Sequence, residues 1–90
     1  MTHSATKLDA IFSQYEKIAE EHHHNVNVRK EIIEELMSKQ VVTADIRKEI
    51  LQHKDDLVYF SQLYRVTVRK MDLVRQLITL EENHPTSAFL

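Results

Sequence analysis

Residues 46–80 read IRKEILQHKDDLVYFSQLYRVTVRKMDLVRQLITL, and this stretch carries a regular pattern of apolar residues. Apolar side chains recur in it at alternating steps of three and four residues, the spacing of a heptad seam along one face of a helix. The seam also contains His53 and Thr67, which are imperfect members of such a series. We therefore expect a long helix that packs through this seam. The residues expected at its interface are Ile50, Leu57, Phe60, Tyr64, Met71, Val74 and Ile78.

Two features modify this expectation along the same stretch. In its second half the apolar stripe is wider than a coiled-coil seam, which suits a bundle better than an isolated pair of helices. The triplet Lys54-Asp55-Asp56 is expected to divide the stretch into two helices, and the alternative is one unbroken helix from Ala44 to Glu82. The residues that widen the stripe are Leu63, Val66, Leu73, Leu77 and Leu80.

The chain on either side also favours helices. It contains no Gly, and its one Pro is Pro85, so the residues that most often interrupt helices are missing before that point. A first helix is expected from near Thr6, although residues 22–28 are middling helix formers that could bend or loop. Thr43 is a plausible N-cap for a second helix that begins at Ala44. Apolar residues at helical spacing in the first helix are Leu8, Ile11, Phe12, Tyr15, Ile18 and Ala19.

The expected fold is all-α, with two or three long antiparallel helices in a hairpin or bundle and no strands. The chain has 90 residues, which allows one small domain or part of a larger one. We expect residues 1–5 to form a disordered N-terminus, residues 6–83 the helical domain or a fragment of one, and residues 84–90 a C-terminal tail. The sequence leaves open whether the chain is truncated after Leu90.

Composition excludes several classes of protein. The chain has no Cys, so it has neither disulfides nor thiolate zinc sites, and no apolar run is long enough to span a bilayer. The polar start lacks the apolar core of a signal peptide. A net charge of −2 gives no overall attraction to nucleic acid or anionic membranes. We expect a cytoplasmic or nuclear protein that does not associate with membranes.

The sequence indicates no catalytic residue and no metal ligand. Glu20 and His23, like Glu81 and His84, have the Glu-x-x-His spacing of di-iron bundles, but the further glutamates of such sites are missing. A second acidic group consists of Glu31, Glu34 and Glu35, which could hold Mg²⁺ for a hydrolase. On one amphipathic helix such a group is more often a solvated face. We therefore expect no cofactor.

One segment is basic enough to approach a phosphate backbone. Arg65 and Arg69 are four residues apart, on one side of a helix, and Tyr64 is near enough to stack on a base. The alternative is a solvated helix face with ordinary ion pairs. The residues expected to contact nucleic acid are Arg65, Arg69, Lys70 and Arg75.

Three blocks, in order, resemble the Trax branch of the translin family. The block from Lys70 to Ile78 reads KMDLVRQLI and is similar to a family segment of the form Lys-Leu-Asp-x-Val-Arg-Gln-x-Ile. Residues 36–41 with 47–51 resemble a Leu-Ser-Arg-Asp-Ile stretch and the helix after it. Phe12 and Tyr15, followed by the acidic residues before the His triplet, resemble the family's first helix. The resemblance covers residues 10–80.

The resemblance implies the N-terminal helices of a longer all-helical protein that assembles with translin into hollow oligomers and binds single-stranded RNA or DNA. In the family, the Mg²⁺-binding carboxylates of the nuclease belong to later helices. The resemblance therefore implies that none of them matches a position in this chain. On this interpretation the chain is a non-catalytic fragment, and its partner is a translin-like protein or a second copy of itself. The alternative is a small helical oligomerisation or adaptor module with no nucleic-acid role, which the heptad seam favours.

Overall fold

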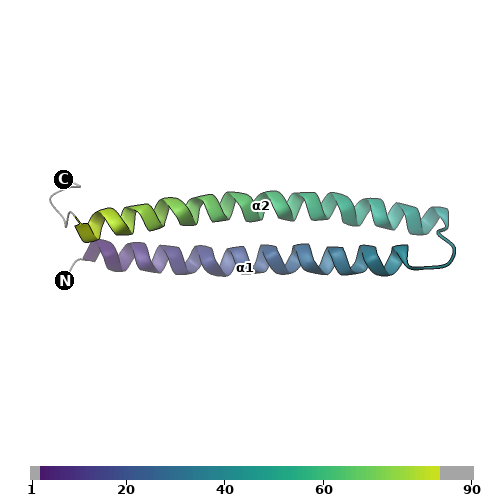
Figure 1. The fold of residues 1–90 in the computed structure, drawn as a ribbon, viewed down its shortest axis with the longest axis horizontal. Helices are drawn as coiled ribbons and strands as arrows, with labels where there is room; N and C mark the ends of the chain where they lie inside the picture. Colours follow the sequence, from purple (N-terminus) through teal and green to yellow (C-terminus); the bar gives the residue numbers. More distant parts are fainter. Residues whose placement is uncertain (1–2, 84–90) are drawn as a thin grey trace. The chain divides into compact units, whose positions relative to one another are not determined.

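The computed structural model describes residues 3–83, which form a helical hairpin of two helices (Figure 1). Helix α1 spans His3–Met37 and helix α2 spans Ala44–Asn83, and this described range contains no strand. The prediction of an all-α fold is confirmed, with two helices rather than three. The expected tail at residues 84–90 lies outside the described residues.

Helix α1 is continuous through the stretch where a bend was considered. Residues 22–28 are helical, and the Asn25 side chain donates a hydrogen bond of 3.0 Å to the carbonyl oxygen of Glu21 one turn earlier. The helix also begins at His3, before the expected start near Thr6. Neither Gly nor Pro precedes Thr6, so the sequence contains no helix-breaking residue between Thr6 and His3.

Helix α1 ends at Met37 without a glycine. The Ser38 amide donates to the carbonyl oxygens of Glu34 and Glu35, at 3.0 and 3.2 Å, and the Ser38 hydroxyl donates to the Glu35 oxygen at 2.7 Å. These bonds satisfy carbonyls that would otherwise lack partners at the helix end. Ser38 thus closes the last turn and starts the connection to α2.

Helix α2 begins where the sequence predicted it. The Ile46 amide donates a hydrogen bond of 3.2 Å to Thr43 Oγ1, and the Arg47 amide donates one of 2.9 Å to the Thr43 carbonyl oxygen. This is the geometry of an N-cap, in which a hydroxyl accepts from an amide of the first turn. Asp45 in that turn also suits the positive end of the helix dipole.

The predicted break at Lys54-Asp55-Asp56 is wrong, because α2 passes through it without interruption. Lys is a good helix former and Asp a middling one, so the triplet costs little helix stability. Lys54 and Asp55 are exposed, while the seam passes on either side of them through His53 and Leu57, which are half-buried. A charged triplet at these positions is compatible with a helix packed on its other face.

The chain divides into two compact units, and in each of them a segment of α1 lies beside a segment of α2 (Figure 1). Within the described residues, unit 1 comprises residues 3–19 and 66–83, and unit 2 comprises residues 20–37, the connection, and residues 44–65. Both units are built on a heptad seam, in which every member is buried or half-buried. We label the seam positions a and d by the usual heptad convention.

Helix α1 supplies a seam that the sequence pattern showed only in part. Its most buried members are Ala19 and Val26, and those of α2 are Val74, Thr67 and Glu81. The α1 positions are Phe12, Ala19, Val26 and Ile33 at a, and Leu8, Tyr15, His22, Arg29 and Leu36 at d. The α2 positions are Ile50, Leu57, Tyr64, Met71 and Ile78 at a, and Ile46, His53, Phe60, Thr67, Val74 and Glu81 at d.

Candidate interface surfaces

The residues predicted to form a helix interface lie on the seam of α2. Val74 is buried, and the other six are half-buried. In unit 2, the His22 ring lies 6.3 Å from the Phe60 ring and the His23 ring lies 5.5 Å from the Tyr64 ring, measured between centroids. At Phe60 and Tyr64, therefore, the seam of α2 is already occupied by side chains of α1.

Unit 2 also places polar atoms inside its seam. Arg29 Nε lies 3.6 Å from Asp56 Oδ2, and the Arg29 guanidinium lies 5.7 Å above the Phe60 ring. Arg29 Nε and the Nδ1 atoms of His22 and His53 are buried and accept or donate no hydrogen bond. The sequence analysis did not place Arg29 in the seam. The sequence signal for this position is a seven-residue spacing, which joins Leu8, Tyr15, His22, Arg29 and Leu36.

In unit 1, cations of α2 cover aromatic rings of α1. Lys70 Nζ lies 5.9 Å from the Tyr15 ring centroid, and the Arg75 guanidinium lies 5.4 Å from that of Phe12. Arg75 Nη1 also lies 3.4 Å from Asp72 Oδ1. Lys70 and Arg75, two of the predicted nucleic-acid contacts, thus have partners within the unit. The charge of each is still exposed to solvent in part, since both residues are exposed.

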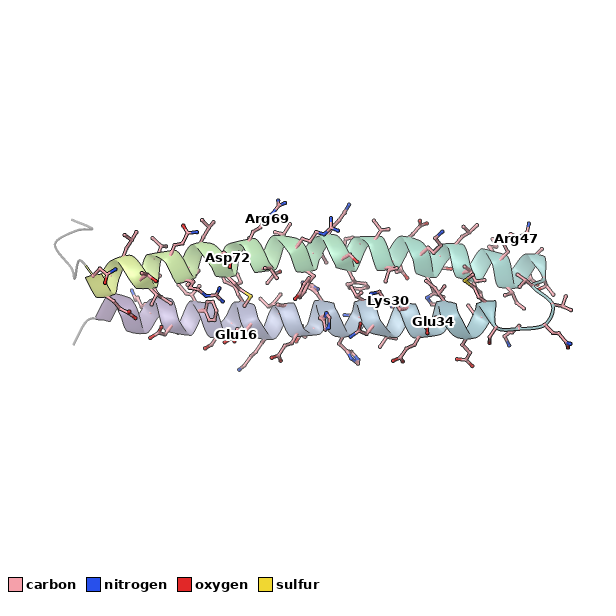
Figure 2. All side chains as sticks on the ribbon, in the orientation of Figure 1. Glu16, Lys30, Glu34, Arg47, Arg69 and Asp72 are labelled. Carbon is pink, nitrogen blue, oxygen red and sulfur yellow. The ribbon has the colours of Figure 1, made fainter. Side chains whose placement is uncertain are left out.

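The other two predicted nucleic-acid residues are also exposed. Arg69, in unit 1, points away from α1 in Figure 2. Arg65 belongs to unit 2. Within the described residues, neither the Arg65 nor the Arg69 side chain forms an ion pair or an aromatic contact. Both guanidinium groups are therefore available to an external anion.

Unit 1 leaves several large apolar side chains exposed on one edge. Six large apolar side chains have between 39% and 60% of their surface accessible, and none of them belongs to the seam. All six occupy heptad positions g or c, which flank the d position on one edge of the helix. We call this group the apolar strip. Its members are Ile11, Ile18, Val66, Leu73, Leu77 and Leu80.

The two helices of unit 1 contribute to the strip from the same edge. Contacts in the unit run in opposite order along the two helices, since Phe12 meets Arg75 and the later Tyr15 meets the earlier Lys70. In such a pair, the g positions of both helices lie on one side of the seam and the e positions on the other. The placement of Lys70, a g residue, over the d residue Tyr15 agrees with this geometry. Ile11 and Ile18 therefore lie on the edge that carries Leu73 and Leu77.

The acidic groups that suggested metal chemistry do not converge. Within residues 3–83, no three His, Cys, Asp or Glu side chains are close enough together to hold a metal ion. Glu31, Glu34 and Glu35 are exposed, and so are Glu20 and His23. His84, which the Glu-x-x-His spacing pairs with Glu81, lies outside the described residues. A shallow surface depression lined by Arg75, Gln76, Thr79 and Leu80 holds no set of catalytic groups.

Searches of protein-family models, of curated proteins and of solved structures found no match to this chain. The resemblance to the translin family therefore rests on the three sequence blocks and stays a prediction. Neither helix in the described part of the chain has an apolar run that could cross a membrane.

Proposed function

We propose that this chain is a helical oligomerisation module, an antiparallel hairpin whose apolar strip packs against helices of another protein chain. The observation that carries the proposal is the strip itself. Large exposed apolar residues that form one patch commonly mark an interaction surface, whereas scattered ones do not. All the exposed large apolar side chains of unit 1, from residue 7 to 19 and from 66 to 83, lie on this one edge.

The antiparallel arrangement is supported by contacts in both units. In unit 2, Arg29 meets Asp56, whereas the earlier residue His23 meets the later residue Tyr64. Unit 1 has the same opposite order. Two helices arranged in this way bury one seam between them, and a further apolar edge is then left for helices of another chain.

The experiment that tests the proposal is the mass of the chain in solution as a function of its concentration. Light scattering should give a mass above the 10.7 kDa of one chain. The double variant Leu73→Gln/Leu80→Gln removes apolar surface from the strip, and we expect it to be monomeric and fully helical by circular dichroism. Gln is a good helix former, so the hairpin itself should not be affected.

The chain offers a matched control for this experiment. Leu51 and Val58 are 55% and 56% exposed, similar to the 60% of Leu73, but they belong to unit 2 and lie at heptad position b. Leu51→Gln/Val58→Gln should keep the mass of the parent chain. A parent chain that is monomeric at every concentration, or a strip variant that assembles as well as the control, would refute the proposal.

A second candidate function is the translin-like assembly with single-stranded nucleic acid. The specific observation in its favour is the exposed and outward-pointing Arg69 (Figure 2). Affinity for a labelled single-stranded RNA should fall steeply with added salt, because phosphate contacts release counterions, and Arg69→Glu should weaken it further. A complex with translin, measured by light scattering of the mixture, would support the family interpretation. Absence of RNA binding at low salt would remove the nucleic-acid role.

A further inference from the structure

The charges around the apolar strip are all of one sign. Positions g, c and f of unit 1, taken over residues 7–19 and 66–83, carry cations and no carboxylate. The carboxylates at Asp9, Glu16, Asp72 and Glu82 occupy the e and b positions, on the other side of the seam. We call the strip together with its cations the basic face. Its cations are Lys7, Lys17, Arg69 and Lys70.

The corresponding edge of unit 2 has the opposite charge. Among its g, c and f positions in residues 20–37 and 44–65, Lys48 is the only Lys or Arg. Arg29 at a d position forms an ion pair with Asp56 at a g position, so this edge of unit 2 also lies next to the d positions of the seam. We call it the acidic face. Its carboxylates are Glu21, Glu31, Glu35, Asp45, Glu49, Asp55 and Asp56.

The acidic face also has apolar side chains that a partner could cover. Val28, Ile32 and Leu63 are half-buried at c and g positions, and Tyr59 at c is 57% exposed. The e and b edge of unit 1, by contrast, is acidic but has no exposed large apolar residue between 7 and 19 or between 66 and 83. The acidic face of unit 2 therefore matches the basic face of unit 1 in both charge and apolar character.

We propose that the partner of the apolar strip is a second copy of this chain, and that the basic face of unit 1 in one copy packs on the acidic face of unit 2 in the other. This inference rests on the proposed oligomerisation function and names its partner. Packing strip on strip would instead bring Lys7, Lys17, Arg69 and Lys70 of two copies together, which like-charge repulsion opposes. Each copy has one basic and one acidic face, so each copy supplies both sides of the contact, as an interface between identical chains requires.

The two faces can be tested by exchanging their charges. In one variant the basic face becomes acidic through Lys7→Glu, Lys17→Glu and Arg69→Glu. In the other the acidic face becomes basic through Glu31→Lys, Glu35→Lys, Glu49→Lys and Asp55→Lys. All of these side chains are exposed and lie outside the seam, so the hairpin of each variant should fold. Each variant alone has two faces of like charge, and its homodimer should be at least about tenfold weaker than that of the parent chain.

The equimolar mixture of the two variants gives the decisive result. In the mixed dimer, the reversed acidic surface of the first variant meets the reversed basic surface of the second, and their unchanged faces also have opposite charges. We therefore expect each variant to be monomeric by sedimentation equilibrium at a concentration where the mixture is dimeric. Added salt should weaken the parent dimer, because charges at the edge of an interface are screened.

The outcomes separate this inference from the proposed function. If the parent chain assembles and depends on Leu73 and Leu80, but both charge variants also assemble alone, the module function stands and the pairing of faces is wrong. Variants that fail to pair when mixed would equally overturn the inference. Binding of the parent chain to anionic vesicles in place of self-association would show that a membrane covers the basic face. A parent chain that stays monomeric overturns both proposals.

Discussion

Replacing Arg29 by Leu should make the hairpin more stable. Arg29 occupies a d position of the seam, with its side chain only 25% exposed, and its Nε atom is buried without a hydrogen bond. A Leu at this position keeps the apolar contacts of the seam and removes the charged group. Asp56, which loses its partner in this variant, keeps its contact with water, because its side chain is 43% exposed.

The magnitude follows from the contacts that Arg29 makes. The ion pair with Asp56, whose side chain is 43% exposed, contributes about 0.2–1 kcal/mol, as partly exposed pairs do. The cation–π contact with Phe60 adds about 0.5–1 kcal/mol. Against these losses, a buried group without a hydrogen bond costs about 1–3 kcal/mol, and Arg loses more side-chain entropy than Leu on folding. The net expectation is an increase in the free energy of unfolding of about 1 kcal/mol.

Urea unfolding followed by circular dichroism measures this change, with both chains at the same concentration. An unchanged slope of free energy against urea would show that the same surface is exposed in both chains. Asp56→Asn serves as a control, since it removes the charge partner but leaves Arg29 in place, and should lower stability by at most about 1 kcal/mol. A loss of more than about 1 kcal/mol in Arg29→Leu would show that Arg29 contributes more through its contacts than its burial costs.

Two further substitutions test the local structure. Thr43→Ala removes the hydroxyl that accepts from the Ile46 amide and should lower stability by about 1 kcal/mol in the same urea assay, whereas the adjacent Val42→Ala should have almost no effect. An equal effect of both would contradict the N-cap. Val74→Ala leaves a cavity in the seam of unit 1, where Val74 is 8% exposed, and should cost about 2 kcal/mol, while Val58→Ala, at a 56% exposed position outside the apolar strip, should cost less than half of that. Val74 would not be a core residue if thermal melts of the two variants coincided.

Much of the fold could be predicted from the sequence because its signals are local. The lack of Gly and the heptad spacing predict helices, and Thr43 marks the start of the second one. The prediction of a helix break at Lys54-Asp55-Asp56 is wrong, because a charged triplet does not by itself end a helix. The triplet lies between seam positions, and the partial burial of the seam residues His53 and Leu57 stabilises the helix more than the triplet disfavours it.

The candidate surfaces could be predicted only in part. The widening of the stripe at Leu73 and Leu77 was visible in the sequence, but Ile11 and Ile18 were indistinguishable from their seam neighbours. Which apolar residues of a broad stripe turn inward depends on how the facing helix meets them, and this is set by tertiary packing. The basic face of unit 1 and the acidic face of unit 2 can be recognised only once the heptad register of both helices is known.

The contacts of the two units also predict an order of folding. Arg29 and Asp56 lie on either side of the connection between the helices, whereas Phe12 and Arg75 lie near opposite ends of the sequence. Closing the shorter loop costs less chain entropy, so unit 2 should form first and unit 1 should follow. Amide hydrogens of unit 1 should accordingly exchange with solvent sooner than those of unit 2. The basic face, one of the two surfaces that we assign to self-association, thus lies on the last part of the hairpin to be completed, which delays pairing between copies until each chain has folded.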